Sequence, residues 1–405
     1  MRFDIHLRSA MRAQIQRLAE TMRLSEERPR LTDCEKDQVS ERLNFFNHTT
    51  TRETLLVAGA HGSGDFPSVS YGDCFVYTAV AQATIYKSDA ISGLREVGPT
   101  PESICHFALV PENESARHAA LDNAFSTLAG TSLAEVIEGS DYRDLKASES
   151  RRSSSVNVLT QSLIRPQAAD AGNLSIQLRS TAELGAVLRL IRGDAKLSYI
   201  LTTGTLSLPL VNKPDVSLFY EHLKRLCCNE AREKAIGFFT FSKAHGLPSI
   251  EIVEELARAR SEPASESVAE HWYLRLPVPG IDSWETPLTQ TRRLPPPGAV
   301  SYLIRFHRTT PSLRLDMDMG FWCDNVRGAT TEETSANEHG IFGSLDYLTH
   351  DQRCYGYPYP LRAAHDRALL TAVDREALRA QIIDAAVRAG MKRSLFREVF
   401  ESVAQ

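Results

Sequence analysis

The stretch LLVAGAHGSGD, residues 55–65, decides the fold. Its apolar beginning predicts a buried strand, and the glycine-rich residues 61–65 predict a turn at the end of that strand. A second run, Cys74–Tyr86, is rich in Val, Tyr, Thr and Ile, which favour strands. We expect these two strands to form a hairpin at the heart of a mixed sheet.

Helical and strand patterns alternate along the rest of the chain. Helices are predicted at 113–145, 179–191, 218–231, 360–371, 374–389 and 395–403, and strands at 198–201, 235–242, 300–306 and 313–319. The polar stretches 147–155 and 259–271 are predicted to be loops. This alternation favours a mixed sheet flanked by helices in one large domain, residues 50–390, of class α/β or α+β, and we predict α/β. Residues 391–405 are assigned to a C-terminal helix.

Residues 1–48 are predicted to form a helical arm. Leu7, Met11, Ile15, Leu18 and Met22 recur at three- and four-residue steps and make one apolar stripe. Further on, Thr32 and Glu35 have the spacing of a capping box, which predicts a second helix through Leu43. Two interpretations stay open: a hairpin packed on the body, or an arm that binds a partner.

Composition limits the functions available to the chain. It has 405 residues, a formal net charge of -5 and seven scattered cysteines. Disordered, fibrous and disulfide-scaffold proteins are therefore excluded, and the overall charge does not attract nucleic acid. The N-terminus lacks the apolar core of a signal peptide, and the longest apolar run is too short to span a membrane. We expect a soluble cytoplasmic protein.

The string GYPYPLRAAH, residues 356–365, is the most distinctive motif. Its prolines predict a rigid entry into a helix, with Pro360 in the first turn. Tyr357 lies just before this helix, and His365 lies about one and a half turns into it. Both polar side chains can therefore point into one pocket, although a proline-rich elbow with a core histidine gives the same pattern.

This string resembles the C-terminal motif Gly-Tyr-Pro-x-Pro-Leu-x-x-Ala-His of the NurA nucleases, the partners of the HerA helicase-translocase. Five further segments resemble NurA segments in the family's order, and the match covers most of residues 50–390. They are residues 56–63, 179–184, 199–206, 239–243 and 313–316.

The resemblance implies an RNase H-like core and a DNA nuclease that uses divalent ions, usually Mn²⁺ or else Mg²⁺. Such ions stabilise the charge of the transition state and generate the attacking hydroxide. It also implies a homodimer that caps a hexameric HerA-like ATPase and resects DNA ends, in repair or in defence against phage.

Three residues match the family's site by position. Glu183 matches the metal-binding glutamate, and Tyr357 and His365 match the final tyrosine and histidine. Lys243 ends the strand that resembles the family's Ser-Lys strand, and the resemblance places it near the scissile phosphate; otherwise it is an exposed strand end. The catalytic set implied is thus Glu183, Tyr357, His365 and Lys243.

Two positions depart from the family. His61 and Thr203 stand where the strand-end aspartates are expected, which removes two negative charges from a site for a hard cation. Asp65 and Asp73 are candidate replacements, and a neutral His61 is itself able to bind Mn²⁺. A rewired metal set would contain Glu183, His365, Asp65 and His61.

Other polar residues carry weaker signals. Asp316 and Asp318 alternate with apolar residues, which favours a solvated strand face over a metal pair. Asn337-Glu338-His339 and His350-Asp351 are predicted to lie in loops, where they supply either ligands or polar surface.

Two functions fit these observations. The first is a metal-dependent DNA nuclease that works with a HerA-like ATPase. The second is a NurA-fold adaptor or regulatory cap that has lost cleavage. We also expect the chain alone to bind DNA poorly, because its net charge is -5 and non-specific binding depends on the number of phosphates neutralised.

Overall fold

The computed structural model describes most of the chain. The described residues are 5–25, 31–50, 54–64, 67–89, 93–142, 171–207, 219–243, 250–261, 271–278, 281–282, 284, 298–307 and 309–397. The predicted loop 147–155 lies outside them, as do residues 262–270 of the second predicted loop and Asp65.

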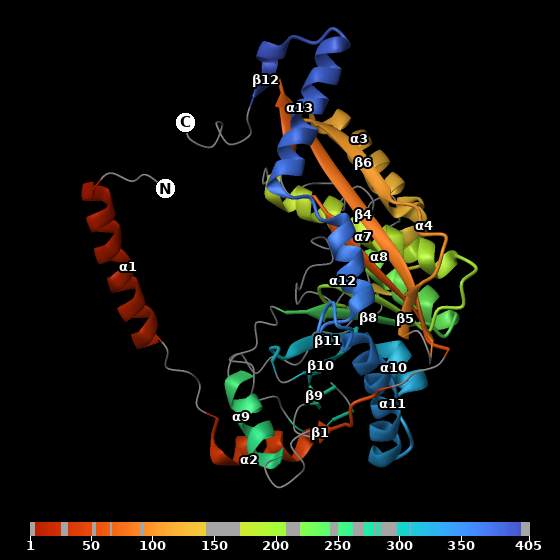
Figure 1. The fold of residues 1–405 in the computed structure, drawn as a ribbon. Coiled ribbons are helices and arrows are strands. Elements are labelled where there is room, and N and C mark those ends of the chain that lie inside the picture. The colour runs from red at the N-terminus through yellow and green to blue at the C-terminus, as the bar shows by residue number, and fades with distance from the viewer. Residues whose placement is uncertain are drawn as a thin grey trace, which may run out of the picture.

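A single mixed sheet organises the described residues (Figure 1). Its strand order is β1-β9-β10-β11-β8-β7-β2-β4-β3-β12, and β5 and β6 also pair with β4. The strands are β1 Leu43–Phe45, β2 Leu56–Ser63, β3 Pro67–Tyr71, β4 Cys74–Asp89, β5 Gly93–Glu96, β6 Ile104–Pro111, β7 Tyr199–Thr203, β8 Gly237–Ser242, β9 Trp272–Arg275, β10 Ala299–Arg305, β11 Leu313–Asp318 and β12 Phe396–Arg397. The α/β class predicted from the alternation is confirmed at this level.

Strand direction changes across the sheet. β2, β7 and β8 are parallel, and β4 is antiparallel to β2. β11, β10 and β9 continue beyond β8 as antiparallel neighbours. β2 and β4 pair as predicted, but β3 lies between them in the chain, so they are not a simple hairpin. The parallel strands bring the carboxyl ends of β2 and β7 to the same edge.

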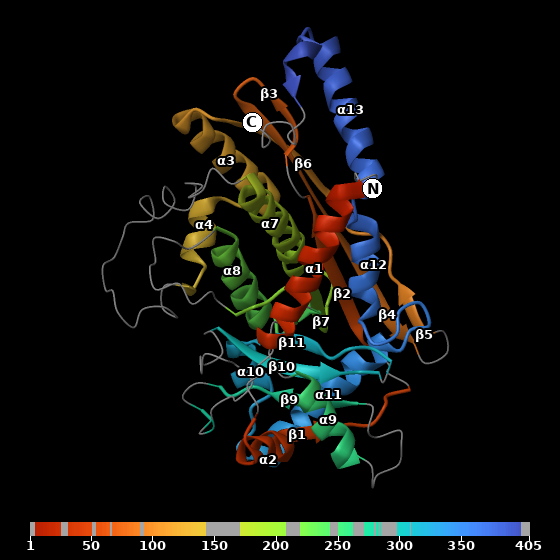
Figure 2. The ribbon, with the colours of Figure 1, turned by 90° about the vertical axis from the view of Figure 1, so that its left-hand side faces the viewer.

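Helices and strands follow one another in runs along the chain. The helices are α1 Ile5–Ser25, α2 Asp33–Arg42, α3 Glu114–Ala129, α4 Leu133–Glu138, α7 Ala171–Arg192, α8 Phe219–Glu233, α9 Ile250–Ser261, α10 Met319–Asn325, α11 Thr331–Thr349, α12 Tyr359–Ala368 and α13 Ala372–Arg388. Strands β2 to β6 are consecutive, and so are helices α10 to α13. Figure 2 shows α3, α7 and α8 on one side of the central strands and α12 on the other. In the described part of the chain, no helix combines the length and apolarity needed to cross a membrane.

Two glycines let helices approach β2 from opposite faces. A Cβ on Gly59 would lie 2.3 Å from the Pro360 carbonyl oxygen of α12, and a Cβ on Gly62 would lie 2.7 Å from the Arg179 carbonyl oxygen of α7. Side chains alternate faces along a strand, so an offset of three residues puts these contacts on opposite faces. His61 therefore shares the α12 face with Gly59.

Separate apolar cores hold the two layers. One contains Phe125 of α3, Val187 of α7 and Leu223 of α8. The other contains Leu345 of α11 and Leu361 of α12, packed on β8, β10 and β11. Burial of this kind stabilises a fold by about 25 cal/mol per Å² of apolar surface. The two cores fix α7 and α12 on the central strands.

The N-terminal segment contains the two predicted helices. Thr32 and Glu35 form the predicted capping box at the start of α2, which ends at Arg42 and runs into β1. Met11 and Ile15 on α1 are exposed, and Figure 1 shows α1 standing away from the sheet.

Several predictions about the second half were wrong. Asn337-Glu338-His339 lie on α11 and not in a loop, because polar residues and Gly340 hide the apolar periodicity of that helix. His350-Asp351 follow α11 in irregular chain, as predicted. Residues 393–397 form a 3-10 turn and strand β12, because β12 pairs with β3 at the sheet edge, so the C-terminal helix predicted from residue 395 is absent there. α9 was not predicted.

Candidate active site

The residues that were matched to the NurA site meet at one edge of the sheet. His61 lies near the end of β2, and Thr203 ends the parallel neighbour β7. α7 brings Glu183 to these strand ends from one face, and α12 brings His365 from the other. Residues separated by more than three hundred positions thus become neighbours.

Glu183 is buried and has an unusually complete set of hydrogen bonds. Its Oε2 accepts from the backbone N–H of Gly62 at 2.9 Å. Its Oε1 accepts from the backbone N–H of Thr203 at 3.1 Å and from the Thr203 hydroxyl at 3.0 Å. The Thr202 hydroxyl also donates to Oε1. Four protein donors therefore satisfy this carboxylate inside the fold.

His61 bonds to the second histidine of the site. Its Nε2 lies 3.0 Å from His365 Nδ1, and its Nδ1 lies 3.4 Å from the Thr203 hydroxyl. His61 Nδ1 is also 3.7 Å from Glu183 Oε2. Burial lowers the pKa of His61 below its ordinary 6.5; Glu183 partly opposes this effect, and His365 adds to it. The ring is therefore neutral at pH 7.

Tyr357 and Lys243 lie together beside this group. The Lys243 ammonium is 4.5 Å from the centroid of the Tyr357 ring, a cation–π distance. Burial, followed by the nearby negative charge of Glu183, raises the pKa of Tyr357 above its ordinary 10.0. Tyr357 is thus a neutral phenol, and Lys243 remains exposed to solvent.

Of the two candidate replacement aspartates, the structure places only Asp73, and Asp73 does not reach the site. Asp65 lies outside the described residues. Asp73 lies at the far end of β4: the strand register pairs His61 with Gln82, nine residues away from Asp73. At about 3.3 Å per residue, that separation is about 30 Å along the strand.

The alternation predicted that Asp316 and Asp318 lie on a solvated strand face, and this prediction was wrong. Both are fully buried, because residues 205–207 cover Asp316 and Arg225 of α8 covers Asp318. Asp316 accepts from Arg314, whose Nε is 2.7 Å away. Burial raises the pKa of Asp316, but Arg314 and the hydroxyls of Thr205 and Ser301 outweigh it and hold the pKa below its ordinary value.

The remaining acids also have structural partners. Asp318 caps α10 and pairs with the Arg225 guanidinium at 2.8 Å. Glu338, predicted in a loop, is buried on α11 and accepts from the hydroxyls of Tyr273 and Tyr302. Neither carboxylate reaches the Glu183 site as a ligand.

The Glu183 group does not fit a two-ion centre. Glu183 is its only carboxylate among the described residues, and both oxygens already accept protein hydrogen bonds. His61 and His365 are bonded to each other. A pair of divalent ions needs several carboxylates to offset its charge.

Thr202 was missed at the sequence level, since a threonine inside a strand gives no sign that it donates to a buried acid.

Comparison with known proteins gives one consistent likeness. No family model matches the chain, and no curated protein matches it. Among solved structures, the NurA nuclease from Sulfolobus solfataricus is 14% identical over 96% of this chain and 99% of its own, with a TM-score of 0.46. The chain is similar to NurA.

Two further structures extend this comparison at lower similarity. A NurA structure with manganese is 12% identical over 95% of this chain and 99% of its own, with a TM-score of 0.35. Endonuclease V from Streptomyces avermitilis is 12% identical over 87% of this chain and 96% of its own, with a TM-score of 0.29. At this level of similarity, the role of each residue rests on the geometry of this chain.

Proposed function

We propose that the chain is a NurA-like subunit of a DNA-processing complex that acts as an adaptor on a HerA-like hexameric ATPase and does not cleave DNA by a two-ion mechanism. The observation that carries this proposal is the state of Glu183. Its two oxygens accept four hydrogen bonds from Gly62, Thr202 and Thr203. These donors use lone pairs of the carboxylate that a metal ion would otherwise bind.

The arrangement of the central strands supports an RNase H-like core. The order β6-β4-β2-β7-β8 places β4 antiparallel to both of its neighbours and makes β2, β7 and β8 parallel. The residues at the NurA-like positions meet at the ends of β2 and β7, as a site grafted on that core requires. This arrangement supports a retained scaffold with changed ligands.

The substitutions at the strand ends explain the loss of cleavage. His61 and Thr203 remove two negative charges from the place where the family resemblance expects aspartates. The Thr203 hydroxyl then donates to Glu183. This hydrogen bond occupies the carboxylate, so that it is less available to a cation. The site has become a hydrogen-bonded polar core, and such networks fix geometry when every member has a partner.

The first helix supplies a surface for the partner. Met11, Ile15, Leu18 and Met22 of α1 are 40%, 60%, 58% and 60% exposed. Apolar side chains in one exposed stripe mark an interaction surface. With a net charge of -5 and weak DNA affinity of its own, the chain relies on the ATPase ring, or on its own dimer partner, to hold DNA.

A cleavage assay tests the adaptor role. The purified chain is incubated with single- and double-stranded DNA in Mg²⁺ or Mn²⁺, with and without the HerA-like ATPase. We expect no cleavage in any condition, together with complex formation and stimulated ATP hydrolysis. Cleavage that is lost in Glu183→Ala and His365→Ala would establish a rewired nuclease instead. Equal loss in Asp65→Ala would identify Asp65 as its replacement ligand.

A truncation tests the proposed partner surface. Deletion of residues 1–30 should abolish the complex with the ATPase or the homodimer, measured by light scattering after size exclusion. Ile15→Ser with Leu18→Ser in the full chain is the finer variant, because it removes only the apolar stripe. Unchanged association in both variants would show that α1 is not the binding surface.

A further inference from the structure

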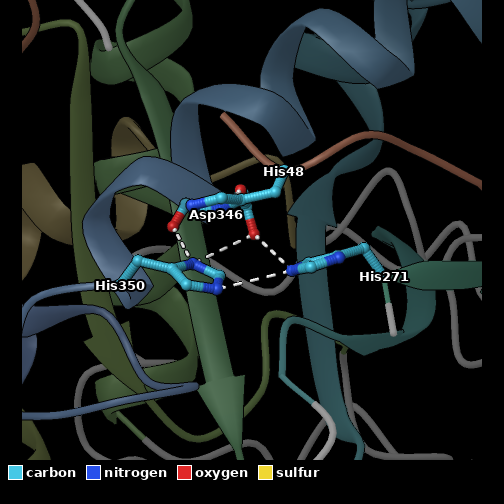
Figure 3. Close-up of side chains that lie close together, drawn as sticks. All are labelled: His48, His271, Asp346 and His350. Carbon is cyan, nitrogen blue, oxygen red and sulfur yellow. Dashed lines mark hydrogen bonds and ion pairs between the residues drawn. The ribbon is translucent and has the colours of Figure 1, made fainter. Parts of the chain in front are cut away.

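Three histidines and one aspartate meet away from the Glu183 site (Figure 3). His48 follows β1, His271 precedes β9, and Asp346 and His350 lie four residues apart at the end of α11. Residues with that spacing share one face of a helix. Each of the four residues offers one ligand atom, and these atoms lie within 4.8 Å of one another.

Asp346 is the centre of the cluster. Its side chain is 0% exposed. Oδ2 accepts from the backbone N–H of Thr49 at 2.7 Å and lies 2.8 Å from His48 Nδ1. Oδ1 is buried and accepts no hydrogen bond from the described residues, although His271 Nε2 is 3.4 Å away and His350 Nδ1 is 3.2 Å away. A buried carboxylate oxygen without a donor is costly unless a cation approaches it.

The orientation of His350 exposes a lone pair to the cluster. Its Nδ1 is 2.9 Å from the Asp346 carbonyl oxygen, which can only accept, so Nδ1 carries the proton. In the neutral ring, Nε2 then has the lone pair, and it faces His271 Nε2 at 3.4 Å. A backbone carbonyl that fixes the tautomer in this way is the usual support of a metal-binding histidine.

Two of the separations equal those of tetrahedral coordination. Ligand bonds of about 2.05 Å to a tetrahedral ion place the ligand atoms about 3.4 Å apart. The distance from His271 Nε2 to His350 Nε2 and that from His271 Nε2 to Asp346 Oδ1 are both 3.4 Å. His48 completes the set. In this structure its Nδ1 donates to Asp346 Oδ2 at 2.8 Å, and a shift of the proton to Nε2 of this partly exposed ring frees Nδ1 for an ion.

Solvent reaches the cluster through a cavity. A cavity of about 690 Å³ is lined by His48, His350 and Arg353. His271 and Asp346 lie behind them and are almost fully buried, with side-chain exposures of 4% and 0%. An ion therefore has a path to the open side of the cluster and a dry, fixed set of ligands on the other.

We propose that His48, His271, Asp346 and His350 form a binding site for one divalent transition metal ion of the zinc class. Three imidazoles and one carboxylate are ligands that zinc accepts in tetrahedral sites. Four protein ligands fill the coordination shell, so the ion has a structural role. It ties the chain after β1, the start of β9 and the end of α11 into one unit.

Metal titration of the full chain tests this site. The chelator-treated protein is titrated with Zn²⁺ by calorimetry and with Co²⁺ by visible absorption. We expect one ion per chain and the intense Co²⁺ bands of tetrahedral coordination. His350→Gln and His271→Asn should each weaken binding by about 100-fold or more, because each removes one of four ligands.

Two controls locate the ion. His106→Gln changes a histidine on β6, and His61→Gln changes the Glu183 site; both should bind Zn²⁺ with unchanged affinity. X-ray absorption of the zinc-loaded wild type should show three imidazoles and one oxygen, a result that does not depend on how the variants fold. No binding, octahedral Co²⁺ spectra, or wild-type affinity in both His350→Gln and His271→Asn would each overturn the proposal.

Discussion

Imidazoles meet a buried carboxylate at two places in this molecule, and the two carboxylates are held differently. At the strand ends, both oxygens of Glu183 accept hydrogen bonds from protein donors. At the end of α11, Oδ1 of Asp346 accepts none from the described residues and has two imidazoles within 3.4 Å. The number of donors on the carboxylate, and not its position in a family motif, decides which group has room for a cation.

The largest effect should come from restoring the family's acids. In the double variant His61→Asp with Thr203→Asp, two carboxylates return and the Thr203 hydroxyl no longer donates to Glu183. We expect Mn²⁺-dependent DNA cleavage to rise on the order of 100-fold or more above wild type, since ions then find oxygen ligands. The single variants and added chelator are the controls. If cleavage stays at background, the missing aspartates are not the only difference between this site and an active nuclease site.

The next prediction is a loss of folding stability that disturbs the Glu183 site but not the histidine cluster. Gly59→Ala should destabilise the fold by about 3 kcal/mol, because the added Cβ meets the rigid Pro360 backbone and forces α12 away from β2. This change should also part His61 from His365, while zinc binding at His271 and His350 is retained. Urea unfolding and zinc titration measure both.

Gly340→Ala is the matched control for that substitution. A Cβ at Gly340 meets nothing within 4 Å, and the residue lies within α11. We expect a gain of about 0.5–1 kcal/mol from helix propensity. Equal stability of the two variants would show that α12 does not press on β2 at Gly59.

A smaller effect concerns the role of Glu183. Glu183→Gln keeps the shape of the side chain but turns its amide N–H toward the N–H of Gly62 or Thr203. We expect a loss of about 2 kcal/mol in the free energy of unfolding. A carboxylate kept for catalysis at the expense of stability predicts the opposite sign. Asp366→Asn, at a half-exposed carboxylate on α12, should stay within about 0.5 kcal/mol of wild type.

The smallest effect is the pH dependence that His61 contributes. Burial lowers its pKa in the folded state below the ordinary 6.5, so the unfolded chain takes up the proton first as the pH falls. The contribution of His61 to stability is therefore complete above pH 6.5 and is lost as the pH falls through the folded pKa. Between pH 8 and pH 5, the free energy of unfolding should fall less steeply with decreasing pH in His61→Gln than in the wild type. A steeper dependence in that variant would contradict the lowered pKa.

The sequence predicted which residues meet at the Glu183 site, but it did not predict the hydrogen bonds that those residues form. The motif that ends in His365 and the strand that ends in His61 brought the right residues together because short local patterns define both elements. Whether Glu183 was available was not predictable, because Thr202 and Gly62 become its donors only when β7, β2 and α7 meet. The burial of Asp316 was missed for a related reason: alternation along β11 does not reveal that residues 205–207, distant in the chain, cover this face.

The histidine cluster had almost no signal in the sequence. Asp346 and His350 have the spacing of one helix face, but no helix was predicted there, and Asn337-Glu338-His339 of α11 were assigned to a loop. His48 and His271 are distant in the chain, and only the pairing of β1 with β9 brings them together. Long-range strand pairing, and not local composition, therefore creates this cluster.

Anomalous diffraction from crystals soaked separately in Mn²⁺ and Zn²⁺ tests the central claim most directly. It locates each ion without reference to activity. We predict a zinc peak among His271, Asp346 and His350, and no peak of either metal between Glu183 and His365. A metal peak bound by Glu183 and His365, with none at the histidine cluster, would contradict the account.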